Sequence, residues 1–282
     1  MIIDIHTHSF PDSIAAPTVR KLSGFSHTVP FTDGTERGIR EGNAACSIDL
    51  AVVLPVATSP GQVEKINAFA AEKNETWRAS GILSFAAMHP DYADYDRELA
   101  ACADRGFRGI KIHPVYQDTD LDDIRCLRIL DRAAELGLTV VTHSGLDVGY
   151  PDARRCTPQM VRHVMQEVKG LTMIAAHMGG WKNWDEVPEL LAETGVYLDT
   201  SFSTGAMHPL DDGHYQPEEL LMLDAGQFTE MVRAFGAERI LFGTDRPWSD
   251  PAECLDFIRG LGLTEAEKGA ILGGNAERLL EL

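Results

Sequence analysis

Five residues of the types that can bind metal ions, four histidines and an aspartate, stand at the ends of short apolar runs. His6 and His8 end the first run one residue apart, a spacing that puts both side chains on one face of a strand. His143, His177 and Asp245 end or directly follow three later runs. One such histidine alone is more often a structural, hydrogen-bonded residue, but five polar residues in equivalent positions favour a metal site. Imidazole and carboxylate ligands without a thiolate suit Zn²⁺ and also Mn²⁺, Fe²⁺ or Co²⁺.

The elements that must position these residues are short strands that alternate with helices. The apolar runs predict eight strands, at residues 1–6, 49–55, 81–88, 106–112, 138–143, 171–177, 196–199 and 239–242. Segments of helical periodicity lie between them at residues 61–77, 94–105, 122–136, 157–168, 185–193 and 225–235. This alternation predicts βαβ units and a parallel sheet. Eight repeats in 282 residues fit one α/β domain, a (β/α)8 TIM barrel over residues 1–282, with the metal site at the C-terminal ends of the strands.

Two connections in this pattern are long. Residues 9–45 follow the first strand and residues 201–223 follow the seventh. Both begin at the C-terminal end of a strand, where barrel enzymes carry their active-site loops. Their glycine, proline and aspartate content predicts loops with short helices, and a surface insertion without a role in the site is the alternative.

Composition limits the class of protein and its partners. The sequence is 44% hydrophobic and 24% charged, as in ordinary globular proteins, and it has no apolar run long enough for a membrane helix. A net charge of −18 argues against nucleic acid as a partner. The five cysteines form no Cys-x-x-Cys pair, so we expect reduced thiols in a cytoplasmic protein. Cys156 adjoins Arg154 and Arg155, which would lower its pKa, but we expect a core residue and not a nucleophile.

The set His6-Thr7-His8, His143, His177 and Asp245 resembles that of the amidohydrolase superfamily. Four further segments resemble its amidohydrolase-2 branch: residues 109–114 (GIKIHP), 176–180 (AHMGG), 243–247 (GTDRP) and 274–279 (GNAERL). That branch includes aminocarboxymuconate semialdehyde decarboxylase and relatives of resorcylate decarboxylase. The resemblance runs from residue 2 to residue 281 and is specific for the branch, not for a substrate.

The resemblance implies a mononuclear metal centre. His6, His8, His143 and Asp245 would hold one divalent ion, for which we expect zinc, with manganese, iron or cobalt as alternatives. His177 would lie beside the ion. Asp245 would accept a proton from a water molecule that the metal activates, and His177 would steady an oxyanion or pass a proton to the substrate.

Two reactions use this set, and a third hypothesis uses no metal. The first is hydrolysis of a C–N or C–O bond, in an amide or lactone of a small metabolite. The second is non-oxidative decarboxylation of an aromatic or muconate-like acid, for which Arg246, Lys182, Arg154 and Trp181 are available to hold the anion. Decarboxylases of this branch tend to be longer than 282 residues, which slightly favours hydrolysis. The third is a metal-free lactonase or a binding protein, against which the intact ligand set argues.

Four other residues carry alternative roles. Lys111 points inward from its predicted strand and would pair with Asp4, contact substrate, or become the carbamylated lysine that bridges two metals in binuclear relatives. His113 would support the site or cap the strand. Trp181, with Lys182 and Trp184, would form a substrate wall or only pack the loop. Arg246 would bind an anionic substrate group or a neighbouring carboxylate. By analogy with other barrels, we also expect a homodimer.

Overall fold

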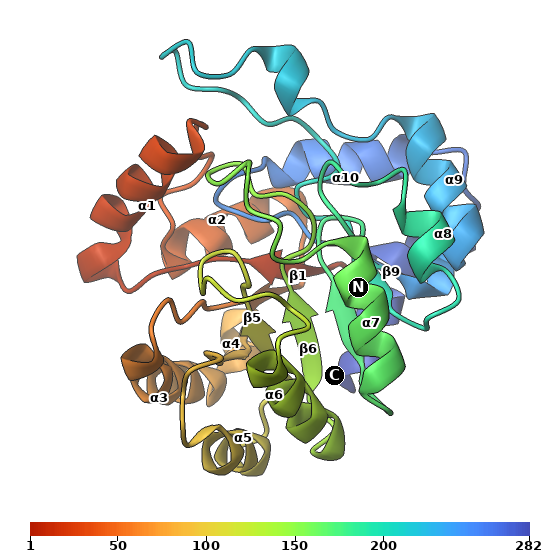
Figure 1. Cartoon of the computed structure of the whole chain (residues 1–282). Helices are drawn as coiled ribbons and strands as arrows, with labels where there is room; N and C mark the ends of the chain where they lie inside the picture. Colours follow the sequence, from red (N-terminus) through yellow and green to blue (C-terminus); the bar gives the residue numbers. More distant parts are fainter. The chain divides into compact units, whose positions relative to one another are not determined.

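The computed structural model describes residues 1–282, and the chain divides into two compact units. The first unit comprises Met1–Val53, Val148–Pro151 and Asp199–Leu282, and the second comprises Leu54–Asp147 and Asp152–Leu198. The first therefore contains both ends of the chain, which appear in red and blue in Figure 1. No helix has the combination of length and hydropathy that a membrane span requires.

Strand β1 (Ile3–Thr7) is the centre of the first unit. It pairs in parallel with β2 (Leu50–Val53), and Ile3 is the partner of Leu50. On its other side, the Ile5 amide donates a hydrogen bond of 2.9 Å to the carbonyl of Phe242, directly after β9 (Ile240–Leu241). Every residue of β1 is buried, as expected for a parallel strand with neighbours on both edges.

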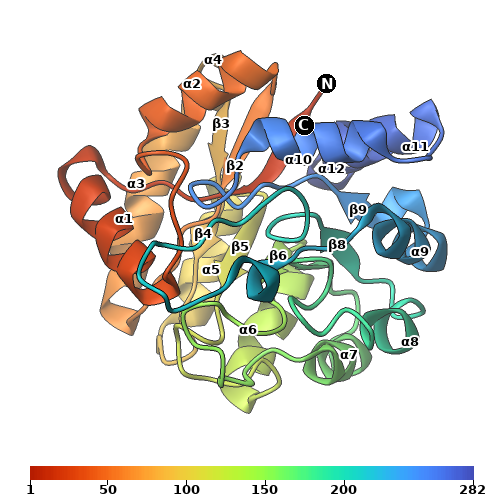
Figure 2. The ribbon, with the colours of Figure 1, turned by 90° about the horizontal axis from the view of Figure 1, so that it is seen from above.

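Six α-helices belong to the first unit. They are α1 (Asp12–Ser26), α2 (Glu36–Cys46), α9 (Ala225–Phe235), α10 (Pro251–Gly260), α11 (Glu265–Gly269) and α12 (Asn275–Leu280). Four of them, α2, α9, α10 and α11, begin with a side-chain cap. In α9, Phe228, Met231, Val232 and Phe235 are buried at helical spacing, so one face of the helix packs inward. Figure 2 shows α10, α11 and α12 in the blue, C-terminal part of the ribbon.

The second unit is a run of parallel βα repeats. Strands β4 (Ala86–Ala87), β5 (Gly109–Ile112), β6 (Thr139–Thr142), β7 (Met173–Ala175) and β8 (Tyr197–Asp199) pair in chain order. Strand β3 (Ile82–Ser84) precedes them. The helices of this unit are α3 (Val63–Asn74), α4 (Trp77–Ser80), α5 (Tyr95–Asp104), α6 (Ile124–Glu135), α7 (Pro158–Glu167) and α8 (Val187–Leu191).

Most elements agree with the predicted pattern, but α4, α10, α11 and α12 were not among the predicted helical segments. Two further differences concern a strand and the long connections. The third predicted strand is divided into β3 and β4 by Phe85, so eight predicted strands correspond to nine observed ones. The first long connection, residues 9–45, is mostly helical because it contains α1 and α2, whereas residues 201–223 contain one 3₁₀ turn, Pro217–Leu220. A single domain over residues 1–282 stays a prediction.

A buried ion pair ties β1 to the segment after β9. The Arg246 guanidinium lies 2.8 Å from the Asp4 carboxylate, and neither side chain is exposed. The Thr244 hydroxyl also donates to Asp4, at 2.6 Å, and Arg246 donates to the side-chain oxygen of Asn43 at 2.8 Å. Burial raises the pKa of Asp4, while the Arg246 charge and the hydrogen bonds oppose that rise. Arg246 is thus a buried partner of Asp4, and the alternative roles of Lys111 stay predictions.

We predict that Arg246→Leu destabilises the protein by about 3–5 kcal/mol, because it leaves the Asp4 carboxylate buried and unpaired. Urea denaturation provides the measurement. The matched control is Arg37→Leu, since Arg37 pairs with Asp33 at 3.2 Å on the surface, and we expect it to leave the urea midpoint nearly unchanged. Equal midpoints for the two variants would contradict the role of the buried pair.

Four of the five cysteines lie in the core, and Cys46 at the end of α2 is the partly exposed one. Burial raises the pKa of Cys156 to about 12, although hydrogen bonds with Thr142 and Ser144 and the charge of Lys111 oppose the rise. Desolvation therefore dominates at this thiol, which agrees with the expectation that Cys156 is a core residue.

We predict that one thiol per chain reacts with Ellman's reagent in the native protein, because reagent access is restricted to Cys46. Cys46→Ser should abolish this reaction, and full unfolding should expose the remaining cysteines. Rapid native reaction of Cys156 would show that the burial argument is wrong.

Candidate functional site

His6, His8 and Asp245 meet in the first unit. One oxygen of Asp245 lies 3.0 Å from Nε2 of His8 and 3.5 Å from Nε2 of His6. The two imidazole rings are 5.1 Å apart and nearly perpendicular, as expected for alternate residues of one strand. Nitrogen and oxygen donors of all three residues lie within 4.8 Å of one another. This set fits a divalent ion because it offers two imidazoles and a carboxylate from rigid positions.

Asp245 is held in place by its backbone. Its amide donates a 2.8 Å hydrogen bond to the carbonyl of His6, so the segment after β9 continues alongside the end of β1. Its φ angle is 63°, in the left-handed region that residues other than glycine seldom adopt. Such conformations are often kept where a side chain must point in one direction. Here the direction is toward His8.

Asp199 and Ser201 lie on the outer side of His6. Nδ1 of His6 is 2.8 Å from a carboxylate oxygen of Asp199 and 2.9 Å from the Ser201 hydroxyl. Because a carboxylate accepts hydrogen bonds, Nδ1 carries the proton and Nε2 keeps the lone pair that faces Asp245. Carboxylates in this position commonly orient histidine ligands of metals and raise their basicity.

The close approach at His6 depends on a glycine. A Cβ atom at Gly243 would lie 2.9 Å from the Cβ of His6 and 3.4 Å from that of Ser201. A larger residue would therefore displace the histidine or the serine. Gly243 lets the segment after β9 pass against the end of β1, which brings Asp245 to the two histidines.

The second unit gathers the other predicted histidines. Nδ1 of His143, which follows β6, lies 3.0 Å from Nε2 of His177, which follows β7. Nε2 of His143 is 3.1 Å from the carbonyl oxygen of Leu146. A carbonyl only accepts, so Nε2 of His143 carries the proton and Nδ1 has the lone pair. In both His6 and His143, a hydrogen-bond acceptor at one ring nitrogen fixes the tautomer and leaves the lone pair on the other nitrogen.

His113 and Asp147 lie next to His143. The His113 and His143 rings stack with centroids 4.4 Å apart, and Tyr116 stacks on the other ring face of His113 at 4.0 Å. Asp147 has a carboxylate oxygen 3.8 Å from Nε2 of His113 and 4.0 Å from Nε2 of His143. His113, His143 and Asp147 therefore form a second buried group of donors within 4.8 Å of one another.

Three residues of the site were not predicted from the sequence. Asp199 ends the strand at residues 196–199 in the same way that His143 and His177 end theirs, so the rule used for the histidines also identifies it. Ser201 follows two residues later. Asp147 lies in a loop four residues after His143. Its closeness in the sequence to a predicted ligand is the one feature that could have identified it.

The remaining predicted residues have clear surroundings. Lys111 is buried in β5, where it lies beside Ala87 of β4 and Val141 of β6. Trp181 is buried in the loop after His177. Arg246 is enclosed with Asp4, so of its two predicted roles the structure favours binding to a neighbouring carboxylate.

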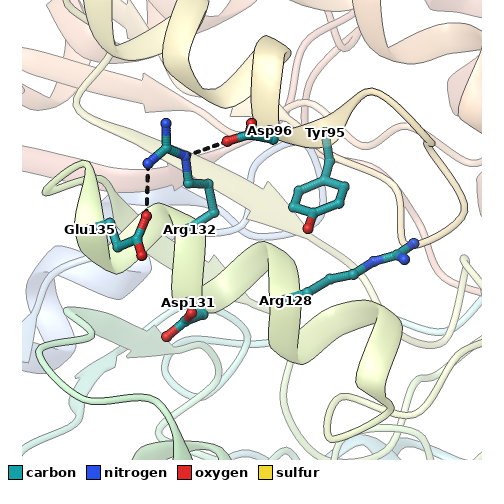
Figure 3. A pocket seen from close by; sticks show the side chains of 6 residues that line it. All are labelled: Tyr95, Asp96, Arg128, Asp131, Arg132 and Glu135. Carbon is teal, nitrogen blue, oxygen red and sulfur yellow. Dashed lines mark hydrogen bonds and ion pairs between the residues drawn. The ribbon is translucent and has the colours of Figure 1, made fainter.

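A surface pocket between α5 and α6 contains none of these residues. It has a volume of about 240 Å³ and is lined by Tyr95, Asp96, Arg128, Asp131, Arg132 and Glu135 (Figure 3). Arg132 pairs with Asp96 at 2.6 Å and Glu135 at 2.7 Å, and Arg128 stacks over the Tyr95 ring. The arginines already have partners in the protein, so the chemistry belongs with the histidine groups.

Comparison with solved structures identifies the fold. A TIM-barrel protein of uncharacterised function from Bordetella bronchiseptica is 19% identical, has a TM-score of 0.75 and covers 99% of this chain and 98% of its own. A dihydroxybenzoic acid decarboxylase from Polaromonas sp. JS666, with bound manganese and the inhibitor 2-nitroresorcinol, is 17% identical with a TM-score of 0.71, covering 100% and 97%. A 5-carboxyvanillate decarboxylase from Sphingomonas paucimobilis is 16% identical with a TM-score of 0.67, covering 100% and 99%.

The family follows from the sequence as a whole. A search of curated proteins gave no match. The family model described as Amidohydrolase matches residues 3–282, which is nearly the full sequence. The TIM-barrel neighbours agree with the parallel α/β elements of the two units and confirm the predicted fold class. The chain therefore belongs to the amidohydrolase family of enzymes and has the α/β barrel fold.

Proposed function

We propose that this protein is a metal-dependent hydrolase that cleaves a C–N or C–O bond in an amide or lactone of a small metabolite. One observation carries the proposal, the convergence of His6, His8 and Asp245 with Asp199 behind His6. Two imidazoles and a carboxylate, with one imidazole oriented by a second carboxylate, are a typical donor set for catalytic divalent metals. The Asp245 carboxylate also supplies a base, which hydrolysis requires.

His143 completes the proposed ligand set. Closure of the chain into one barrel would bring the C-terminal ends of its strands to one face, so we propose His143 as a ligand beside those at the end of β1. The hydrogen bond to the Leu146 carbonyl gives His143 a lone pair on Nδ1, as Asp199 gives His6 a lone pair on Nε2. When bound by His6, His8, His143 and Asp245, a zinc ion would lower the pKa of a water molecule and polarise a substrate oxygen.

The protein side chains would carry the proton transfers. Asp245 would accept a proton from the attacking water, because its carboxylate lies beside the proposed ligands His6 and His8. His177 donates a proton to the leaving group or steadies the oxyanion that forms on the substrate. The left-handed backbone of His177, with a φ of 60°, fixes the direction of its ring in the way seen for Asp245.

Decarboxylation of an aromatic or muconate-like acid is the second candidate. It is favoured by the Polaromonas and Sphingomonas neighbours, which are decarboxylases, the first of them with manganese. Decarboxylases were expected to be longer than this chain, but the match covers 97% and 99% of these two decarboxylases. Chain length therefore does not distinguish hydrolysis from decarboxylation. In this reaction His177 would protonate the carbon that loses carbon dioxide. For this reaction, manganese is an alternative to zinc as the metal ion. That the protein is a cytoplasmic homodimer remains a prediction.

We predict that a panel of lactones, amides and aromatic acids contains lactones or amides that the protein hydrolyses without release of carbon dioxide. Asp245→Asn should lower the turnover number by about 100-fold or more, because it removes the proton acceptor. The matched control is Asp250→Asn, whose side chain caps α10 and accepts from the amide of Ala252. Asparagine keeps that cap, so the activity of this variant should equal that of the native enzyme.

The two products distinguish the candidates. pH-stat titration measures the proton released when a lactone opens, an amine assay measures amide cleavage, and a coupled assay measures carbon dioxide. Lactone or amide cleavage without carbon dioxide release supports hydrolysis. Carbon dioxide release from an aromatic or muconate-like acid, without hydrolysis of any lactone or amide, would overturn hydrolysis in favour of the second candidate.

A further inference from the structure

The chain turns directly after Asp199, and four hydroxyl side chains are buried there. They are Thr200, Ser201, Ser203 and Thr204, none of which is exposed. The hydroxyls of Thr200, Ser203 and Thr204 donate to backbone carbonyls, at 2.9, 3.1 and 3.4 Å. The hydroxyl of Ser201 instead contacts two side chains of the candidate site, those of Asp199 and His6. This difference indicates a role for Ser201 at the site and not only in the turn.

Ser201 binds the Asp199 carboxylate through two groups. Its backbone amide donates to Oδ1 of Asp199 at 3.0 Å, the two-residue turn that aspartate side chains commonly form. Its hydroxyl donates to the same oxygen. The other carboxylate oxygen, Oδ2, lies 2.8 Å from Nδ1 of His6. Because Ser201 holds one oxygen of Asp199, the carboxylate can rotate away from His6 only by breaking both of these hydrogen bonds.

The Ser201 hydroxyl also determines what His6 meets at Nδ1, from which it lies 2.9 Å. A serine hydroxyl has one proton and two lone pairs, and a carboxylate oxygen only accepts hydrogen bonds. The proton of Ser201 therefore points to Asp199, and a lone pair faces His6. Nδ1 of His6 thus faces two acceptors, Oδ2 of Asp199 and Oγ of Ser201. Without a proton on Nδ1, both contacts would lose their hydrogen bond in a buried position, which is costly.

We propose that Ser201 is a positioning residue that, together with Asp199, keeps the proton of His6 on Nδ1 and leaves the lone pair of Nε2 available to a divalent cation. The hydroxyl acts through both partners, because it holds the carboxylate in place and accepts a hydrogen bond from the imidazole. Outer partners of this kind tune the affinity of a metal ligand. The inference rests on the proposed function, since it takes His6 as a ligand of the metal ion.

The metal-free protein provides the first test. In protein labelled with ¹⁵N-histidine, nitrogen–proton correlation spectra show which ring nitrogen of each neutral imidazole carries the proton. His6→Gln assigns the signals of His6. We expect the native protein to have the His6 proton on Nδ1. In Ser201→Ala, the two nitrogen shifts of His6 should move toward each other, because Asp199 loses the hydroxyl that holds it and the second tautomer becomes populated.

Zinc affinity provides the second test, measured by competition with a chromophoric chelator. Ser201→Ala should raise the dissociation constant for Zn²⁺ by about 10-fold, as expected for the loss of an outer partner of a ligand. The matched control is Ser203→Ala, which removes a buried hydroxyl from the same turn but one that donates to the Ser201 carbonyl. This control should leave the zinc affinity and the His6 spectrum unchanged. Circular dichroism verifies that each variant is folded.

Three outcomes would overturn the role of Ser201. They are a His6 proton on Nε2 in the native metal-free protein, a folded Ser201→Ala protein with the native His6 spectrum and zinc affinity, and equal changes in Ser203→Ala. Equal changes would show that the effect belongs to the stability of the turn. Failure of the proposed function has a different signature. A native protein that binds no zinc, but whose His6 tautomer changes in Ser201→Ala, keeps the role of Ser201 at His6 and loses the metal centre.

Discussion

The hydrogen bond between Nδ1 of His6 and the Asp199 carboxylate is the contact on which the candidate site depends most. It joins the end of β1 to Asp199, which lies 193 residues later in the sequence, and it sets which nitrogen of His6 has the lone pair. A buried carboxylate is costly unless it is paired, so Asp199 and His6 stabilise each other as well as orienting the ring. Without this contact, His6 could turn its proton toward Asp245 and lose its capacity to bind a cation.

The buried ion pair between Asp4 and Arg246 also helps to position the site. Asp4 precedes His6 by two residues and lies on the same face of β1, and Arg246 follows Asp245 directly. The pair therefore fixes the relative position of the two segments that carry three of the proposed ligands. Close passage of the backbone at Gly243 has the same effect by a steric route. Charge, hydrogen bonding and glycine geometry together place Asp245 against His6 and His8.

Much of this architecture could be predicted because it follows from short-range rules. The two-residue repeat of a strand places His6 and His8 on one face, and apolar runs that end in histidine locate β6 and β7. The partners of these residues could not be predicted equally well. Asp4 and its partner Arg246 are 242 residues apart, so no local pattern pairs them. The tautomer of His143 depends on one carbonyl, that of Leu146, which no residue pattern marks.

The long connections show where sequence patterns predict the structure poorly. Glycine, proline and aspartate in residues 9–45 predicted a loop with short helices, yet α1 and α2 occupy most of it. Pro17 lies inside α1, where proline normally ends a helix, so burial of Ala15 and Val19 on one face outweighs the local penalty. Tertiary packing decides such segments, and a single sequence gives little access to it.

Metal analysis tests the central claim most directly. Elemental analysis of the purified protein should find about one equivalent of a divalent ion, and His8→Ala should lose it. His163→Ala, which changes an exposed histidine of α7, should retain it, and Asp199→Asn should bind it about 10- to 100-fold more weakly. Absence of metal after reconstitution, or equal affinity in the Asp199→Asn protein, would contradict the account, and two equivalents would contradict a mononuclear centre.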